Sequence, residues 1–300
     1  MKIITLMENE ACGGLCAARG LSQYIETPKH KILFDMGPDG AFIENAEKLG
    51  VDLAAVDVAV LSHGHSDHGG GLRAFCEVNS HADVLVHPDA FGDFYAVVPG
   101  QAPRYIGLEA DIWELESRVV PTAPGLRLDE ELSLLGDIPN TFPWTPVVEK
   151  LQEKTAEGFR RDEFHHEQHL LVEAWGKTAL FAGCGHGGIV NIVRAAEAQL
   201  GRRPDAVFGG FHLFELDPAD PRSEALLRAT GEELAKGDTV YYTGHCTGAY
   251  AFEVLHGILG ERLRPMHGGT VAEVLRQTAR AAGLRHISDQ RTLTIKKQTR

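Results

Sequence analysis

The residues best suited to chemistry lie at positions 62–71, directly behind the apolar run 58–61. Four potential metal ligands fall within six residues there: His63, His65, Asp67 and His68. Alternate residues of an extended backbone share a face, so the first two imidazoles can converge on one ion. The last two ligands begin the next element and can reach a second ion. Imidazole and carboxylate together suit zinc, and also manganese or iron. We interpret this stretch as a metal site rather than a solvated turn.

Three later histidines also follow apolar runs that end in glycine. His186 comes after residues 177–181 and Cys184, His212 comes after 206–208, and His245 comes after 239–242. One such histidine alone would be read as a turn residue. Because three consecutive strands end in this way, the pattern indicates one shared site.

The motif His63-x-His65-x-Asp67-His68 behind an apolar strand resembles the signature of the metallo-β-lactamase superfamily. The resemblance implies an α/β fold, a four-layer αβ/βα sandwich with a metal site along one edge. The later motifs at residues 183–189, 209–213 and 245–248 resemble the branch named β-ribofuranosylaminobenzene 5′-phosphate synthase-like or dihydropteroate synthase-like. That branch is linked to methanopterin and folate-type chemistry.

The resemblance implies how the ligands divide between two divalent metal ions, zinc being the first choice. One ion would be held by His63, His65 and His186, and the other by Asp67, His68 and His245. His212 would bind metal or lie beside the leaving group. Asp35, at the end of a predicted strand, would form hydrogen bonds that orient the metal ligands without binding metal itself. Alternatively, Asp35 only caps the turn that follows the strand.

One position departs from the superfamily's usual pattern. Many members place a bridging Asp after a strand-end Gly, and here Cys184 follows Gly183. Either Cys184 binds metal as a thiolate or His186 substitutes for the carboxylate, and the site holds two ions or one. His165, His166 and His169 are alternative donors.

This constellation suits hydrolysis. Two ions about 3.5–4 Å apart can bridge a water molecule and lower its pKa toward neutrality. Asp67 would then orient the attacking hydroxide. If His212 does not bind metal, it would protonate the departing group, since imidazole titrates near physiological pH.

The elements that must position these residues alternate along the chain. We expect strands at residues 22–26, 31–34, 58–61, 82–86, 169–175, 177–181, 206–208 and 239–242, and helices at 41–49, 189–200, 223–236 and 271–282. Strands that alternate with helices favour an α/β fold, in which sites gather at the carboxyl ends of strands. Residues 287–297 are basic and expected to be peripheral.

Residues 91–164 break this periodicity and carry several aromatic rings and prolines. We expect residues 1–300 to form one domain in which this segment is an insertion that covers the substrate. Its candidate substrate-binding residues are Arg104, Tyr105, Trp113 and Trp144, with Arg118 as another candidate for an anionic group. The alternative is that the rings only pack the insertion onto the body.

Composition narrows the class of partner. The chain has 29 Lys and Arg against 42 Asp and Glu, a net charge of −13 that would repel a nucleic acid backbone. No apolar run is long enough to span a membrane. The N-terminus turns polar too early for a secretory signal, and five cysteines fit a reducing compartment. We expect a cytoplasmic protein with a small-molecule substrate. The sequence does not decide whether the protein forms a homo-oligomer.

The sequence therefore predicts a metal-dependent hydrolase for a small, phosphorylated or pterin-like molecule. The alternatives are a metal-dependent synthase or transferase of pterin or methanopterin biosynthesis and a non-catalytic metal-binding sensor. A di-iron redox protein ranks lowest, because that branch of the superfamily usually has Glu where this chain has His65.

Overall fold

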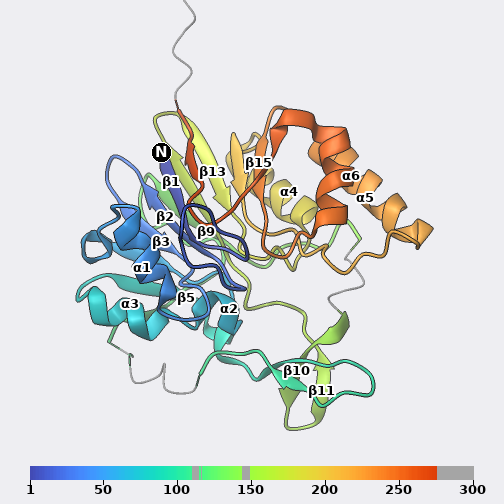
Figure 1. The fold of residues 1–300 in the computed structure, drawn as a ribbon, viewed down its shortest axis with the longest axis horizontal. Coiled ribbons are helices and arrows are strands. Elements are labelled where there is room, and N and C mark those ends of the chain that lie inside the picture. Colours follow the sequence, from blue (N-terminus) through green and yellow to red (C-terminus); the bar gives the residue numbers. More distant parts are fainter. Residues whose placement is uncertain (110–114, 116, 144–148, 276–300) are drawn as a thin grey trace, which may run out of the picture.

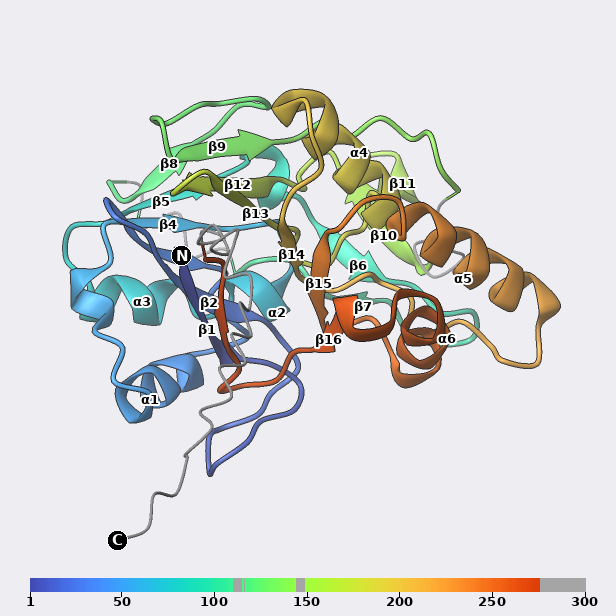
Figure 2. The same cartoon turned by 90° about the horizontal axis from the view of Figure 1, so that it is seen from above.

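The computed structural model describes residues 1–109, 115, 117–143 and 149–275. Two large β-sheets pack face to face, and helices cover the outer face of each sheet (Figure 1, Figure 2). The layers run helix, sheet, sheet, helix. This arrangement confirms the predicted four-layer αβ/βα sandwich.

The first sheet has seven strands. Their order is β17 (Val271–Glu273), β1 (Lys2–Met7), β2 (Ser22–Glu26), β3 (Lys31–Phe34), β4 (Val58–Val60), β5 (Asp83–Val86) and β8 (Val119–Pro121). The strands from β17 to β3 are antiparallel, whereas those from β3 to β8 run parallel. Parallel strands are covered on both faces, which explains the unbroken apolar run of β4.

The second sheet has six strands and repeats this plan. Their order is β16 (Leu263–Pro265), β15 (Val240–Thr243), β14 (Ala206–Phe208), β13 (Lys177–Phe181), β12 (His169–Ala174) and β9 (Leu132–Leu135). The strands from β13 to β16 run parallel, so the ends of β13, β14 and β15 open at the same edge.

Helices close the outer layers. The elements are α1 (Ala41–Lys48), α2 (Ser66–Gly69), α3 (Leu72–Val78), α4 (Ile189–Leu200), α5 (Pro221–Leu234) and α6 (Ala249–Leu259), with 3-10 turns at Leu53–Ala55, Pro88–Phe91 and Gly260–Arg262. Helices α1 and α3 pack on the first sheet, and α4, α5 and α6 pack on the second.

Side-chain alternation within single strands builds the separate cores. In β3, Ile32 and Phe34 face the second sheet, whereas Leu33 between them packs with the residues beneath α1 and α3. Successive strand residues point to opposite faces, so a short apolar strand contributes to two cores at once. The two sheets are thereby held in fixed relation, which keeps their strand ends beside one another.

Residues 91–164 are divided among three sheets. A small third sheet has the order β11 (Gly158–Arg161), β10 (Leu151–Thr155), β6 (Phe94–Ala96) and β7 (Arg104–Tyr105), and it lies below the sandwich in Figure 1. Strands β8 and β9 come from the same segment but belong to the two main sheets. The extra structure beside the site is therefore smaller than the predicted insertion.

The predicted helix at residues 271–282 is wrong in its described part. Val271–Glu273 form β17, which pairs antiparallel with β1 and buries Ala272 between the sheets. Pairing with an exposed sheet edge overrides the helical periodicity of so short a segment. Residues 276–282 and 287–297 lie outside the described residues. Among the helices that are described, none combines the length and apolar character needed to cross a membrane.

Candidate metal centre

The predicted site residues meet at the edge where the parallel strands of both sheets end. Asp35 follows β3, His63 and His65 follow β4, Cys184 and His186 follow β13, His212 follows β14, and His245 follows β15. Asp67 and His68 lie in the short helix α2. The structure brings these predicted residues together, because the sandwich stacks the two sets of strand ends at one edge.

Unusual backbone angles turn several of these side chains inward. Asp35, His212 and His245 have φ values of +59°, +49° and +48°. Residues other than glycine rarely adopt this left-handed region, and it costs about 1–3 kcal/mol each where the surroundings impose it. Such outliers are common at functional sites, and here three of them surround one cluster.

The first group of candidate ligands consists of His63, His65 and His186. One ring nitrogen of each lies within 4.8 Å of the others, and the Nε2 atoms of His63 and His186 are 3.3 Å apart. Burial and neighbouring histidines lower the pKa of His63 and His186 well below the usual value and that of His65 to about 3. The rings are therefore neutral at physiological pH, the state that binds metal.

The second group consists of Asp67, His68 and His245. The Nε2 atoms of the two histidines are 3.2 Å apart, and Nε2 of His245 lies 3.6 Å from Oδ2 of Asp67. Burial opposes ionisation of Asp67, but the nearby histidines outweigh it and lower its pKa to about 2. This carboxylate is thus ionised and able to face a cation.

Cys184 lies between the two groups. Its Sγ is 3.1 Å from Nε2 of His68, and it belongs to three sets of mutually close donors, formed with His63 and His68, with His186 and His212, and with His245 and Cys246. Burial and the adjacent Cys246 raise the pKa of the Cys184 thiol well above its usual value. A bound cation would reverse that shift, because coordination deprotonates a thiol.

Hydrogen bonds behind the histidines fix which nitrogen faces the cluster. Asp35 accepts from Nδ1 of His68 at 2.6 Å and from the Ser62 hydroxyl at 2.8 Å. Since that hydroxyl proton is used, the Ser62 oxygen accepts from Nδ1 of His63 at 2.8 Å. Nδ1 of His245 donates to Oδ1 of Asn9 at 2.9 Å. In the neutral form of each ring, the proton therefore lies on Nδ1 and the lone pair of Nε2 faces the cluster, and Asp35 lies where the resemblance implied.

The partnership with Asp35 also changes the charge that His68 carries. Burial alone would lower the pKa of His68, but the charge of Asp35 and its hydrogen bond raise that pKa to about 9. The carboxylate therefore stabilises positive charge at this ring, whether a proton or a bound cation supplies it.

Sequence reasoning missed two acidic residues that hold the ligand loops. Glu167 accepts hydrogen bonds from the backbone N–H groups of His186 at 2.7 Å and Gly187 at 2.8 Å, and burial raises its pKa to about 8. Glu8 accepts from the N–H of His245. No local motif marks either residue. The polar run 165–169 before a buried strand was the one available signal for Glu167.

The alternative donors at residues 165–169 have other partners. Nδ1 of His166 accepts from the N–H of Gly64 at 3.0 Å, and its Nε2 donates to Asp162 at 3.0 Å. Although His65, Asp162 and His166 are mutually close, both ring nitrogens of His166 are engaged. His166 therefore positions the loop between His63 and His65. Nδ1 of His169 lies 3.3 Å from the carbonyl of Ala182, and its Nε2 lies 3.7 Å from Oε2 of Glu167.

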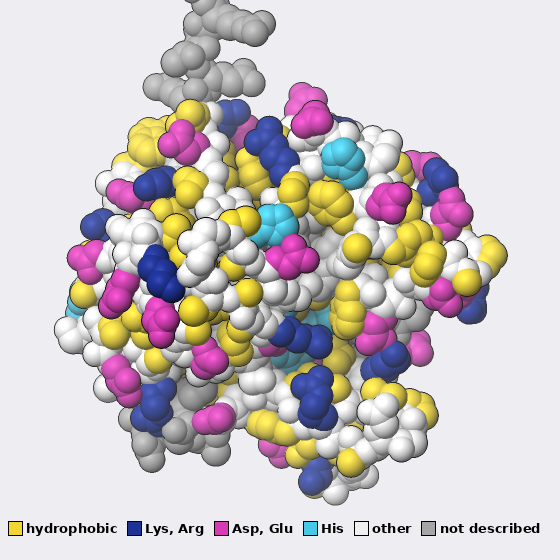
Figure 3. All heavy atoms as spheres, in the orientation of Figure 1, with side chains coloured by type: hydrophobic (Ala, Val, Ile, Leu, Met, Phe, Trp, Pro, Cys, Tyr) yellow, Lys and Arg dark blue, Asp and Glu magenta, His cyan; other side chains and the backbone are white. Residues whose placement is uncertain are grey.

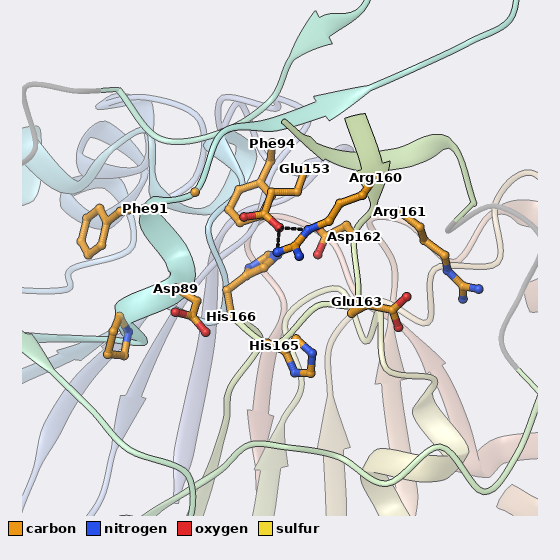
Figure 4. Close-up of a pocket in the computed structure, with 12 residues that line it drawn as sticks. Asp89, Phe91, Phe94, Glu153, Arg160, Arg161, Asp162, Glu163, His165 and His166 are labelled. Atoms are coloured by element: carbon orange, nitrogen blue, oxygen red, sulfur yellow. Dashed lines mark hydrogen bonds and ion pairs between the residues drawn. The ribbon is translucent and has the colours of Figure 1, made fainter. Parts of the chain in front are cut away.

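A cavity of about 740 Å³ lies on the far side of His166, lined by residues of the 3-10 turn Pro88–Phe91 and of the small sheet. Figure 4 shows Arg160 paired with Glu153 at this cavity, and His165 among its lining residues. His165 is thus separated from the candidate ligands. At this cavity Glu153 pairs with Arg160, and Asp162 pairs with His166.

A second cavity, of about 250 Å³, opens directly onto the candidate ligands. Its lining residues are Arg19, Pro38, His65, Ser66, Asp67, Arg104, Ile106, Leu151, Cys184, His186, His212, His245 and Cys246. We call this cavity the cleft. It brings the predicted residues Arg104 and His212 to the same space as both ligand groups.

Other predicted substrate-binding residues lie elsewhere. The hydroxyl of Tyr105 donates to the carbonyl of Leu108 at 2.6 Å, and its ring packs on Tyr95. Neighbouring strand residues face opposite ways, so Arg104 and Tyr105 cannot both enter the cleft. Arg118 binds the carbonyls of Asn79 and Ala82 and is structural. Trp113 and Trp144 lie outside the described residues.

The donor set fits divalent metal ions. Nε2 of His65 is buried and has no hydrogen-bond partner among the described residues. Two pairs of Nε2 atoms face each other across the cluster, 3.2 Å apart in His68 and His245 and 3.3 Å apart in His63 and His186. Facing lone pairs repel unless a proton or a cation lies between them. Nitrogen, sulfur and carboxylate donors together match the preferences of zinc.

Comparison with known proteins agrees with this site. The family model described as Metallo-beta-lactamase superfamily matches residues 19–245. The chain therefore belongs to the metallo-β-lactamase superfamily, a fold that implies divalent metal binding. The structure of Tm1679, described as a metal-dependent hydrolase of the beta-lactamase superfamily, is similar with a TM-score of 0.75 and 25% identity, covering 91% of this chain and 99% of that one.

Two proteins of Methanocaldococcus jannaschii are similar over most of their length. The uncharacterized protein MJ0448 is 29% identical over 255 residues, 83% of this chain and 92% of that protein. A 7,8-dihydropterin-6-methyl-4-(beta-D-ribofuranosyl)-aminobenzene-5'-phosphate synthase is 28% identical over 289 residues, 90% of this chain and 96% of the synthase. The similarity to the synthase confirms the branch of the superfamily that the strand-end motifs resemble.

Proposed function

We propose that this protein is a metal-dependent hydrolase that acts on a small molecule and uses two divalent ions, zinc being the preferred metal. The observation that carries the proposal is the pair of ligand groups at one edge of the sandwich. His63, His65 and His186 form one group, and Asp67, His68 and His245 form the other. Members of both groups line the same cleft: His65 and His186 from the first, and Asp67 and His245 from the second.

The bound ions would act as Lewis acids and lower the pKa of a water molecule toward neutrality. The side chain of Asp67 is 25% exposed at the cleft, and its low pKa keeps it ionised. It is suited to accept a hydrogen bond from the attacking water and to fix its direction. Asp67 thus combines ligand and orienting roles.

His212 is suited to the opposite end of the scissile bond. It lines the cleft, and its ring centroid is 4.2 Å from that of His186. A histidine at this place can donate a proton to the leaving group as the bond breaks. In this assignment His212 contacts the substrate rather than a metal ion.

Cys184 takes the bridging place between the two ligand groups in this proposal. A thiolate is a softer donor than the Asp usual at this position, and it favours zinc over magnesium or manganese. Cys246 packs behind it, with its Sγ 3.5 Å from the Cys184 carbonyl.

Solvent oxygen tests the hydrolase assignment. Metal-loaded protein would be incubated in ¹⁸O-labelled water with phosphodiesters, carboxylic esters and pterin phosphates. We expect one class to be cleaved with one labelled oxygen in the product, and Asp67→Asn to abolish the reaction. Absence of turnover in protein with its full metal content would contradict the hydrolase assignment and favour a metal-binding sensor.

The similarity to the methanopterin-related synthase supports a second candidate, a metal-dependent synthase or transferase of pterin chemistry. In that reaction the ions would hold a phosphoribosyl donor. Product analysis separates the two candidates. Pyrophosphate release together with a new C–C or C–N bond, without uptake of solvent oxygen, would favour the synthase.

A further inference from the structure

Two arginines from distant parts of the chain line the cleft. Arg19 lies in the loop between β1 and β2, and Arg104 begins β7 of the small sheet. We propose that they form an anion-binding site and that the substrate is a small organic molecule with a phosphate or carboxylate group. This inference rests on the proposed function and specifies its substrate class.

Arg104 has no counter-charge within the part of the chain that the structure describes. Among the described residues, no carboxylate or carbonyl oxygen lies within hydrogen-bonding or ion-pair distance of its guanidinium. By contrast, Arg160 of the same small sheet forms a bidentate pair with Glu153, with nitrogen–oxygen distances of 2.9 and 2.6 Å. A cation that lines a cleft and has no partner among the described residues is poised to meet an anionic ligand, in a chain whose net charge is −13.

Arg19 lies at the cleft, and its interactions there leave guanidinium N–H groups available for a ligand. Its guanidinium carbon lies 5.5 Å from the ring centroid of Phe214, and its Nε is 3.9 Å from Oδ2 of Asp67. The stacking orients the side chain, whereas the long separation from Asp67 is weaker than a hydrogen bond. The side chain is 62% exposed and lines the cleft, so its guanidinium is accessible to a ligand there.

The remaining cleft wall suits an organic group. Pro38, Ile106 and Leu151 contribute apolar surface opposite the candidate ligands. The volume of about 250 Å³ is smaller than the roughly 300–1,000 Å³ typical of sites for drug-sized ligands. A small molecule, or one end of a larger one, therefore fits. In Figure 3, basic side chains lie beside exposed histidine atoms near the middle of the face, above the small sheet.

Guanidinium groups select oxyanions. Their planar N–H pairs match the two oxygens of a carboxylate or phosphate, and they keep their charge at all physiological pH values. An anion held by Arg19 and Arg104 would place the attached organic group next to Asp67 and His212. The two arginines thus supply substrate affinity, while the strand-end residues supply the chemistry.

Anion binding to metal-loaded protein tests the proposal. Inorganic phosphate and acetate would be titrated by calorimetry into wild type, Arg19→Gln, Arg104→Gln and Arg160→Gln. We expect wild type to bind at least one of the two anions, with affinity about 10-fold lower in each of the first two variants and unchanged in Arg160→Gln. The anion that shows this dependence identifies the substrate group.

Metal content, measured on the same samples, separates this proposal from the proposed function. We expect Arg19→Gln and Arg104→Gln to keep the metal content of wild type. Equal anion affinity in all four proteins, or no binding of either anion by wild type, would overturn the anion site while leaving the metal centre intact. Absence of metal from wild type would instead contradict the proposed function.

Discussion

The Sγ atom of Cys184 lies 3.1 Å from Nε2 of His68, although 116 residues separate the two in sequence. Cys184 follows strand β13 of the second sheet, and His68 lies in helix α2, which follows strand β4 of the first. The contact therefore joins the two halves of the sandwich at the point between the ligand groups. A sulfur at this place has a spectroscopic signature that carboxylates and imidazoles lack.

Replacing the native metal with Co²⁺ is expected to give an intense thiolate-to-cobalt charge-transfer band in the near-ultraviolet. Cys184→Ser removes the thiolate and should remove this band. Cys246→Ser is the matched control, because Cys246 is also buried beside the cluster. The measurement is the absorption spectrum of each cobalt-loaded protein. If the band survives in Cys184→Ser but disappears in Cys246→Ser, the metal ligand is Cys246, which would contradict the role proposed for Cys184.

Asp35 should control metal affinity without touching the metal. It accepts hydrogen bonds from the Ser62 N–H, the Ser62 hydroxyl and Nδ1 of His68. Asp35→Asn replaces one acceptor oxygen with a donor, so we expect metal affinity to fall about 10–100-fold. Competition with a chromogenic chelator measures the change. Asp39→Asn, an exposed residue four positions away, should retain wild-type affinity, and an equal loss in both variants would contradict a specific role.

His166 should act on stability and on the loop that carries the ligands. His166→Ala leaves the buried N–H of Gly64 without its acceptor, which costs about 1–3 kcal/mol of unfolding free energy. Urea unfolding of the metal-free protein measures this cost separately from metal binding. His165→Ala is the neighbouring control and should change stability by less than about 0.5 kcal/mol. Similar losses in the two variants would argue against the positioning role.

His30 gives a pH-dependent prediction away from the metal centre. Burial alone would lower its pKa, but hydrogen bonds to Asp129 at 2.6 Å and Asp57 at 3.1 Å outweigh burial and raise the pKa. A folded-state pKa above the unfolded value of about 6.5 stabilises the fold fully below that pH. The contribution is lost as the pH rises through the folded-state pKa.

His30→Gln should therefore lower the unfolding free energy by about 0.5–1 kcal/mol near pH 6 and by less near pH 9. Urea denaturation at both pH values measures the difference. His81→Gln, at an exposed histidine, provides the control. A penalty for His30→Gln that is the same at both pH values would show that packing, not charge, explains the loss.

The parts of the site that sequence reasoning predicted share a local signal. His63, His65, His186, His212 and His245 each follow a short apolar run, and parallel strands bring such positions to one edge. Asp35 follows the same rule. Strand ends can therefore be recognised without knowing which strands are neighbours.

The parts that sequence reasoning missed depend on tertiary contacts. Asn9 and Glu8 reach His245 across more than 230 residues, and no local pattern encodes that pairing. Tyr105 was assigned to the substrate site with Arg104, but strand alternation allows only one of two neighbours to face the cleft. β17 forms because β1 offers an unpaired edge, a fact of the whole sheet rather than of residues 271–273.

Metal content per chain tests the central claim most directly. Elemental analysis of protein purified without chelators would compare wild type with His63→Ala, His186→Ala and His87→Ala. His87 is a suitable control because it is buried but uses Nδ1 to accept from the N–H of Asp89. We predict about two ions per chain in wild type and His87→Ala, and a clear loss in the other two variants. Wild-type protein that binds no zinc, manganese or iron even after resupply would contradict the account.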